Sequence, residues 1–338
     1  MHRRDFLKFS GAGIASTVLG GVGFIGWSPR SYAVMIERTF YITQGLMTMI
    51  DGTDVYVKGF STTPNVVNMP GEMILTDDGK ALQEDDTVSV TLHNTLSTPH
   101  NFTIDGVVDK VVPARETLRF SFTVKKWGSY LFYDSSNAPY NRLLGLYGAM
   151  PVMPKGSKNE LYSGSRTFVQ QYAWIFSDID PVWHDALRQG NTPNTPYVPR
   201  YFTLNGLGGR PPGAPGAHDP NIDAITDPRS ALHGHIGTRT LVRMCNVGLA
   251  DQSVHAHGNH MEWLTLNGQA RSEVWEKDCL YLDSKMGKID SIYPFEVPPD
   301  SWPLVETSTY PMHLHTEMSQ TAAGGYYMFG AMTDIYFE

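Results

Sequence analysis

The chain has 338 residues, of which 41% are hydrophobic and 18% are charged, with 32 glycines and 22 prolines. This balance is typical of a globular, turn-rich β protein, and the length is sufficient for two domains. The net charge of -8 argues against nucleic acid as a partner, because nucleic-acid binding needs a basic surface.

Residues 1–33 have the features of an export signal. The twin arginine Arg3-Arg4 is followed by a hydrophobic pair and a lysine, and then by an uncharged Gly- and Ala-rich stretch over residues 9–29. A Ser-Tyr-Ala sequence ending at Ala33 fits a signal-peptide cleavage site. A membrane anchor is the competing interpretation, but six glycines make this stretch a poor spanning helix. We therefore expect a twin-arginine signal peptide and a periplasmic location.

Residues 36–154 are expected to form a first β-domain. Short runs of β-branched and aromatic residues alternate with turn-forming pairs such as Asp51-Gly52. No long segment has the 3.6-residue period of a helix. The expected strands cover residues 39–42, 54–57, 87–92, 118–124 and 129–133.

A polar segment, residues 155–166, is expected to link this domain to a second β-domain over residues 167–338. One short helix is expected at residues 180–189, and a Gly- and Pro-rich loop at residues 206–220. The chain is therefore predicted to be all-β, with two tandem β-sandwiches. Strands of the second domain are expected at residues 167–172, 240–244, 278–282 and 328–337.

Two His-x-His pairs are the strongest functional signal in the sequence. They are His255/His257 and His313/His315. Side chains two residues apart on a strand point to the same face, so each pair would present two imidazoles side by side. The two pairs could meet only by strand pairing within one β-domain. A metal site is the favoured interpretation, and two unrelated His-containing strands at a sheet edge are the alternative.

The chain has two cysteines, Cys245 and Cys279, and neither is near a His pair in the sequence. Neither lies in a motif that marks a nucleophile or a zinc site. Both fall in expected strands of the second domain. A disulfide between them is therefore possible in an oxidising compartment, and the sequence leaves it open.

Several further motifs give the chain a resemblance to a known family. In the first domain they are Val90-Thr91-Leu92-His93-Asn94, Thr98-Pro99-His100-Asn101-Phe102, Gly128-Ser129-Tyr130-Leu131-Phe132-Tyr133 and Gly145-Leu146-Tyr147-Gly148-Ala149. In the second they are Pro199-Arg200-Tyr201-Phe202-Thr203-Leu204-Asn205-Gly206 and His255-Ala256-His257-Gly258. The chain resembles the multicopper oxidases and copper nitrite reductases. This resemblance implies two tandem cupredoxin-like Greek-key β-sandwiches, with copper as the cofactor.

The chain departs from this family at the type 1 copper positions. A type 1 site needs a cysteine thiolate and two histidines. In the second domain the thiolate position holds Leu314, and one histidine position holds Gln252. In the first domain His100 matches a type 1 histidine, but the thiolate position holds Ser135 and the axial position lies near Leu146. The resemblance therefore implies that neither domain has a type 1 copper.

The family's trinuclear cluster takes four His-x-His pairs, two from each of two domains. Both second-domain pairs are present here, but the first-domain positions hold Thr103 and Asp105, and Asp134 and Ser136. The resemblance thus implies a domain-interface pocket of four imidazoles facing Asp105 and Asp134. These aspartates could be ligands, partners that fix His tautomers, or proton donors to bound oxygen. Ordinary turn and strand-end aspartates are the alternative.

Copper suits this set of imidazoles by affinity order, and zinc or iron stay open as alternatives. His260 is close to the first pair in the sequence, and we include it with His100 among the candidates. The candidate metal ligands are His255, His257, His313, His315, His100 and His260.

The resemblance implies a copper-dependent oxidoreductase that reacts with a small molecule, such as O2 or a nitrogen oxide, and takes electrons directly from a substrate or docked donor. The main alternative is a non-catalytic periplasmic copper-binding or scaffold protein. A zinc hydrolase on the same histidines is a third alternative. Two-domain relatives commonly form homotrimers, which would place the metal site between subunits, with one subunit's His pairs facing Asp105 and Asp134 of the next.

Overall fold

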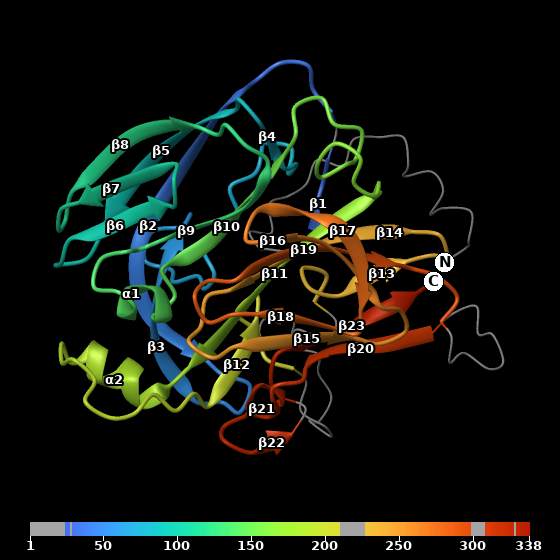
Figure 1. Cartoon of the computed structure of the whole chain (residues 1–338). Helices are drawn as coiled ribbons and strands as arrows, with labels where there is room; N and C mark the ends of the chain where they lie inside the picture. Colours follow the sequence, from blue (N-terminus) through green and yellow to red (C-terminus); the bar gives the residue numbers. More distant parts are fainter. Residues whose placement is uncertain (1–23, 28, 210–226, 299–307, 328) are drawn as a thin grey trace, which may run out of the picture.

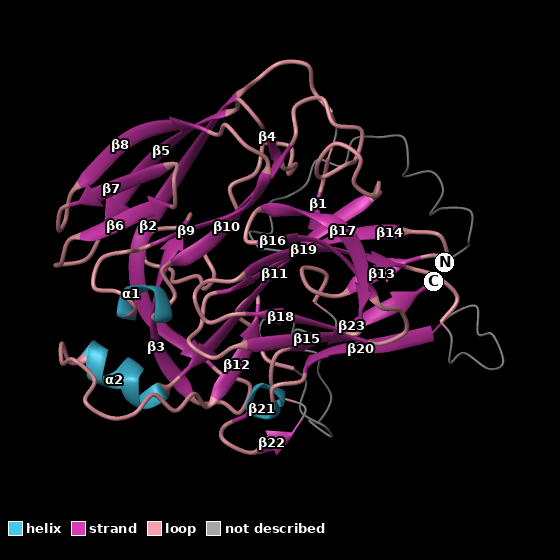
Figure 2. Ribbon diagram, in the orientation of Figure 1, coloured by secondary structure: helices cyan, strands magenta, loops and turns pink. Residues whose placement is uncertain are grey.

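The computed structural model describes residues 24–27, 29–209, 227–298, 308–327 and 329–338. Strands dominate this part of the chain, and the few helices are short (Figures 1 and 2). The all-β prediction is confirmed. Most of the predicted export signal, residues 1–23 and 28, lies outside the described residues. No helix among the described residues is long and apolar enough to cross a membrane.

The strands between residues 35 and 153 form two sheets that pack face to face. One sheet has the order β3-β2-β5-β8 and the other the order β4-β10-β9-β6-β7. A short helix, α1 (Tyr140–Leu143), precedes the last strand. The strands are β2 (Met35–Thr48), β3 (Asp54–Ser61), β4 (Leu82–Gln83), β5 (Thr87–Asn94), β6 (His100–Ile104), β7 (Val108–Val112), β8 (Thr117–Thr123), β9 (Gly128–Tyr133) and β10 (Tyr147–Met153).

The remaining chain forms a second pair of large sheets. One has the order β1-β11-β14-β19-β16-β17, with β12 paired to β11, and the other the order β13-β23-β20-β15-β18. The strands of the first of these sheets are β1 (Phe24–Ile25), β11 (Gln170–Ile179), β12 (Tyr201–Leu204), β14 (Arg239–Asn246), β16 (Met261–Leu266), β17 (Gln269–Lys277) and β19 (Lys288–Pro294). Those of the second are β13 (Leu232–Gly234), β15 (Gln252–Ala256), β18 (Cys279–Leu282), β20 (Ser308–Leu314) and β23 (Met332–Phe337).

Two smaller features complete this half. A two-stranded ribbon, β21 (Thr321–Ala322) and β22 (Tyr326–Tyr327), follows the 3-10 helix η2 (Glu317–Gln320). The helix expected at residues 180–189 is α2 (Pro181–Arg188), which Asp180 caps by accepting a hydrogen bond from the amide of Val182. Helix α2 packs on β3, so it lies across the boundary between the two halves (Figure 2).

Strict alternation of side chains explains why the first sandwich forms. In β5, Val88, Val90 and Leu92 are fully buried, while the residues between them are partly exposed. This period of two is the pattern of a strand with one face on a core. The buried faces meet around Phe102 and Phe132, whose rings stack with centroids 5.2 Å apart.

The two halves share a hydrophobic core and a buried polar bridge. Val55 and Leu131 from the first half and Ile292 from the second belong to the same buried cluster. Beside it, the guanidinium of Arg243 donates to the Ser129 hydroxyl at 3.0 Å and lies 3.8 Å from a carboxylate oxygen of Asp290. Ser129 in turn donates to Asp290.

Removing the carboxylate of Asp290 should strongly destabilise the protein. Arg243 is 2% exposed and Asp290 is 1% exposed, so Asp290→Ala would leave a buried cation without its counter-ion. We expect a loss of about 3–5 kcal/mol of unfolding free energy in chemical denaturation. Asp77→Ala is the matched control, because Asp77 pairs with Arg38 at the surface and should cost less than about 1 kcal/mol. Equal effects of the two substitutions would contradict this assignment.

The segment just before the first sandwich is part of the fold. Ile25 is 1% exposed and belongs to the shared core. Arg30 makes two hydrogen bonds to the fully buried carboxylate of Asp86, at 2.6 and 3.2 Å. Cleavage after Ala33 would remove both contacts and leave Asp86 without its cation.

A chain that begins at Val34 should therefore be less stable than one that begins at Phe24. Loss of the Arg30 charge alone should lower the free energy of unfolding by about 3 kcal/mol, because it leaves the buried carboxylate of Asp86 without its cation. Thermal melting should compare three proteins: the chain from Val34, the chain from Phe24, and the chain from Phe24 with Arg30→Ala. The loss of stability in Arg30→Ala measures the ion pair, and the further loss in the shorter chain measures the burial of Ile25. Identical melting curves for all three would show that residues 24–33 do not stabilise the fold.

Candidate metal centre

The two His-x-His pairs lie at the ends of adjacent antiparallel strands of one sheet, with His255 on β15 and His313 on β20, and with His257 and His315 directly after these strands. β15 pairs with β20 in a register that places His255 directly opposite His313. The amide of His257 donates to Pro311 at 3.0 Å, and the amide of His315 donates to Ser253 at 2.8 Å. Figure 1 shows β15 between β18 and β20. The pairing that the sequence required for the four histidines to meet is therefore present.

Hydrophobic residues of the same strands direct all four imidazoles to one face. Val254, Met312 and Leu314 are fully buried, and Ala256 is 2% exposed, so the opposite face of both strands packs on the second-domain core. Because side chains alternate along a strand, the residues at odd positions point the other way. Burial of these hydrophobic side chains thus sets the register of the two strands. As a consequence, the four histidines lie on the same face.

The imidazoles are close enough to share a metal ion. The Nε2 atoms of His257 and His313 are 3.1 Å apart. The His255 ring lies 4.4 Å from the ring of His257 and 4.3 Å from that of His315, measured between centroids. His255, His257 and His313 each offer a nitrogen within 4.8 Å of the others.

The local environment keeps two of these imidazoles in the metal-binding form. Partial burial, aided by the neighbouring imidazoles, lowers the pKa of His257 and of His313 below the ordinary value. Both rings are therefore neutral at pH 7, which is the form that binds metals. The Nδ1 of His313 faces the carbonyl of Leu314 at 3.3 Å, which directs its Nε2 towards His257.

A cysteine joins the histidines, which sequence spacing did not indicate. β18 pairs with β15 on the side opposite β20 and places Cys279 directly opposite His255. The Sγ of Cys279 lies 3.3 Å from Nδ1 of His315 and 3.7 Å from Nδ1 of His255. Partial burial and the carboxylate of Asp278 raise the pKa of this thiol.

The disulfide that the sequence left open is not formed. Cys245 lies in β14, in the other sheet, and both cysteines are free. Cys245 is buried, and that burial raises the pKa of its thiol to about 12. Of the two cysteines, Cys279 is the one that lies beside the candidate metal centre.

The centre opens to a polar cavity of about 410 Å³. His255, His257 and His260 line it together with three acidic residues, Glu276, Asp278 and Glu296. His260 is exposed, and its Nε2 lies 3.6 Å from Asp278, which is itself 3.0 Å from Nδ1 of His255. The structure thus places His260 at the rim of this cavity.

A second, smaller cavity of about 210 Å³ lies beside two of the imidazoles. His257 and His313 line it with Pro311, Ala331 and Met332. Its lining is mainly apolar. Because His257 lines both cavities, its imidazole stands between a polar and an apolar space.

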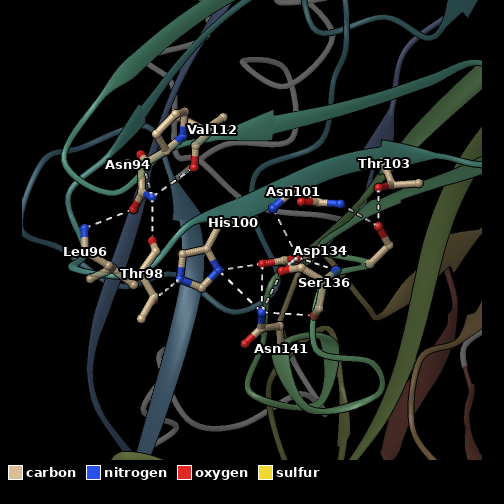
Figure 3. Close-up of polar contacts among 12 residues, drawn as sticks. Asn94, Leu96, Thr98, His100, Asn101, Thr103, Val112, Asp134, Ser136 and Asn141 are labelled. Atoms are coloured by element: carbon tan, nitrogen blue, oxygen red, sulfur yellow. Dashed lines mark hydrogen bonds and ion pairs between the residues drawn. The ribbon is translucent and has the colours of Figure 1, made fainter.

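His100 and Asp134 form a separate buried network in the first domain (Figure 3). Nδ1 of His100 is 2.5 Å from a carboxylate oxygen of Asp134, and both side chains are almost fully buried. Asp134 also accepts from the Asn101 amide at 3.1 Å, from the Ser136 amide and hydroxyl at 2.8 and 2.5 Å, and from the Asn141 amide group at 3.1 Å. The acceptor sites of Asp134 are therefore occupied within this domain.

The structure does not bring the two predicted aspartates to the imidazoles of the same chain. Asp105 is exposed and accepts a hydrogen bond from Tyr133 at 2.8 Å. Burial and this hydrogen bond raise the pKa of Tyr133 to about 12. Among the described residues, neither Asp105 nor Asp134 lines the two cavities beside the imidazoles.

No protein-family model and no functionally curated protein matches the chain. Solved structures match most of its length. A blue copper oxidase from Nitrosomonas europaea gives a TM-score of 0.70 at 17% identity, over 89% of this chain and 85% of that one. The fold is that of the multicopper oxidases and copper nitrite reductases.

Two further structures have the same fold. The multicopper oxidase mgLAC gives a TM-score of 0.68 at 19% identity, over 90% of this chain and 87% of the other. A copper nitrite reductase from Nitrosomonas europaea gives a TM-score of 0.63 at 16% identity, over 90% of this chain and 94% of the other. The predicted two-domain cupredoxin-like architecture is thus confirmed at the level of the fold.

The network around Asp134 predicts a large effect of a single substitution. Asp134→Ala would leave His100 and Asn141 without their buried acceptor, and we expect a loss of about 3 kcal/mol or more of unfolding free energy. Asp105→Ala is the control, because its carboxylate is exposed and should contribute less than about 1 kcal/mol. Chemical denaturation measures both. A stable Asp134→Ala protein would contradict a structural role for this carboxylate.

Proposed function

We propose that this protein binds copper at the His255, His257, His313 and His315 cluster and is a copper-dependent oxidoreductase that acts on a small molecule. The observation that carries the proposal is the 3.1 Å separation of the His257 and His313 Nε2 atoms. Two nitrogens bound about 2.0 Å from one metal lie about 2.8 Å apart at the right angle of a tetragonal site and about 3.3 Å apart at the tetrahedral angle. The separation therefore fits two ligands of one ion.

The donor set favours copper among the divalent metals. Neutral imidazoles suit copper, zinc, iron and nickel, and copper binds most tightly in the affinity order. A bound copper ion would polarise or reduce a small oxidant such as O2 or a nitrogen oxide. The chain's own residues orient the imidazoles, lower the pKa of two of them, which favours the neutral form, and line an apolar cavity beside His257 and His313.

Electron transfer would follow a direct route in this proposal. The positions of the family's type 1 ligands hold Leu314 and Gln252 in the second domain, and both side chains are fully buried. In the first domain His100 contacts Asp134 and Thr98. A substrate or docked donor would therefore deliver electrons at the polar cavity, whose acidic lining favours a small polar or cationic molecule.

The cellular setting is also part of the proposal. The twin-arginine sequence supports export of the folded protein to the periplasm. Assembly as a homotrimer would place the centre against a neighbouring subunit. Asp105 is exposed and available for such a contact, whereas Asp134 is fully buried and already hydrogen-bonded. Light scattering on the purified protein tests the trimer, and a monomer would contradict it.

A non-catalytic copper-binding or scaffold role is the second candidate. The observation that favours it is the polar network around His100 and Asp134, which occupies the first-domain copper position with hydrogen bonds among protein groups. This candidate predicts no turnover of small oxidants by a copper-loaded protein. The proposed oxidoreductase predicts turnover that depends on the imidazoles.

Copper loading followed by metal analysis and electron paramagnetic resonance tests the proposal. We expect about one divalent copper per chain with a type 2 signal from the imidazole ligands. The double variant His257→Ala/His313→Ala should lose this copper. The double variant His233→Ala/His235→Ala is the matched control, because its His-x-His pair lies at the other end of the sheet, on and after β13, and it should keep the copper. No copper in the wild type would refute the proposal.

A further inference from the structure

Cys279 completes a second group of donors beside the three-histidine group. His255 on β15 is paired with Cys279 of β18 on one side and with His313 of β20 on the other. The three residues therefore form one row across the sheet. His315 comes directly after the end of β20, and its Nδ1 lies 3.3 Å from the same thiol. His255, Cys279 and His315 each offer one donor atom within 4.8 Å of the others.

The distances in this group match those that a metal would need. A metal with bonds of about 2.0 Å to nitrogen and 2.3 Å to sulfur, at the tetrahedral angle, holds the two donors about 3.5 Å apart. The observed distances from Cys279 Sγ are 3.3 Å to His315 and 3.7 Å to His255. Paired strands hold Cys279 and His255, and a backbone hydrogen bond of 2.8 Å from the His315 amide to Ser253 holds His315 just after β20.

We propose that Cys279, His315 and His255 form a second copper position that is selective for Cu(I). A thiolate is a soft ligand and favours Cu(I), whereas imidazole is a harder ligand that also suits zinc, iron and nickel. This inference rests on the proposed function for the identity of the metal. It adds a ligand and an oxidation state that the histidine pairs do not imply.

Binding at this position requires one proton to leave and no change of oxidation state. The S–H bond of Cys279 breaks, its proton passes to solvent, and a bond from sulfur to Cu(I) forms. His255 also changes its tautomer. Its Nδ1 lies 3.0 Å from the backbone carbonyl of Asp278, to which it donates without a metal. Binding through Nδ1 moves that proton to Nε2.

The two copper positions are coupled through His255. This residue belongs to both groups, and five side chains supply one donor fewer than two separate three-ligand sites require. A Cu(I) ion beside Cys279 therefore competes with a divalent ion at His257 and His313 for the same imidazole. The polar cavity gives solvent access to this shared residue.

Competition titration of Cu(I) against a chromophoric chelator, under anaerobic reducing conditions, tests the inference. Cys279→Ser should weaken Cu(I) binding by at least about 100-fold, since removing a direct ligand should exceed the effect of losing an outer-shell partner. Cys245→Ala is the matched control, because Cys245 is a free cysteine buried in the other sheet, and this variant should bind as the wild type does.

Thiol labelling of the native wild type provides a second readout that needs no variant. Cys279 is partly exposed and should react, whereas buried Cys245 should not. Cu(I) should protect Cys279 from the reagent. Equal Cu(I) affinity of Cys279→Ser and wild type, or unprotected labelling at saturating Cu(I), would overturn the inference.

The failure of this inference is distinguishable from that of the proposed function. If the wild type takes up neither Cu(I) nor divalent copper, both are wrong. If His257→Ala/His313→Ala abolishes divalent copper binding while Cys279→Ser leaves Cu(I) binding unchanged, only the inference is wrong. If Cys279→Ser loses Cu(I) and keeps divalent copper, both are supported.

Discussion

The centre depends above all on the register between β15 and β20. His255 lies opposite His313, and the shift of one residue would turn every side chain of a strand to the other face. Such a shift would bury the imidazoles and expose Val254 or Leu314. The hydrophobic effect therefore fixes the positions of the metal donors, since each core-facing side chain stabilises the register by about 1.5–3 kcal/mol.

The two halves of the molecule differ in what occupies corresponding positions. The first half fills its position with His100, Asp134 and Asn141, whose hydrogen bonds leave the carboxylate fully satisfied. The second half leaves His255 and His257 facing a polar cavity, and Nε2 of His257 lies 3.1 Å from Nε2 of His313. Imidazoles that face a cavity are suited to binding, whereas a saturated network is suited to stability.

Sequence patterns predicted the parts of this structure that depend on local spacing. Alternation identified strands such as β5, and the His-x-His spacing placed His255 and His257 on one face. Cys279 was missed because its role depends on β18 pairing with β15, a neighbour relationship that no local pattern contains. The sequence predicted a strand at residues 278–282, but the order of strands in the sheet was needed to identify the partners of Cys279.

The sequence also did not predict interactions between distant segments. The ion pair of Arg30 and Asp86 joins residues 56 positions apart. Arg30 lies inside the stretch whose composition predicts an export signal, and Asp86 lies in the first sandwich. Asp134 appeared as a candidate beside the imidazoles, but its environment is decided by His100 and Asn141 in the folded first domain. Such contacts depend on tertiary packing, which residue type and spacing do not reveal.

Anomalous X-ray scattering at the copper edge, from crystals of the copper-loaded protein, tests the central claim most directly. We predict an anomalous peak within bonding distance of the Nε2 atoms of His257 and His313. A copper-loaded crystal whose peaks lie only at other residues, with these two imidazoles still in mutual contact, would contradict the claim that this sheet face is the metal centre.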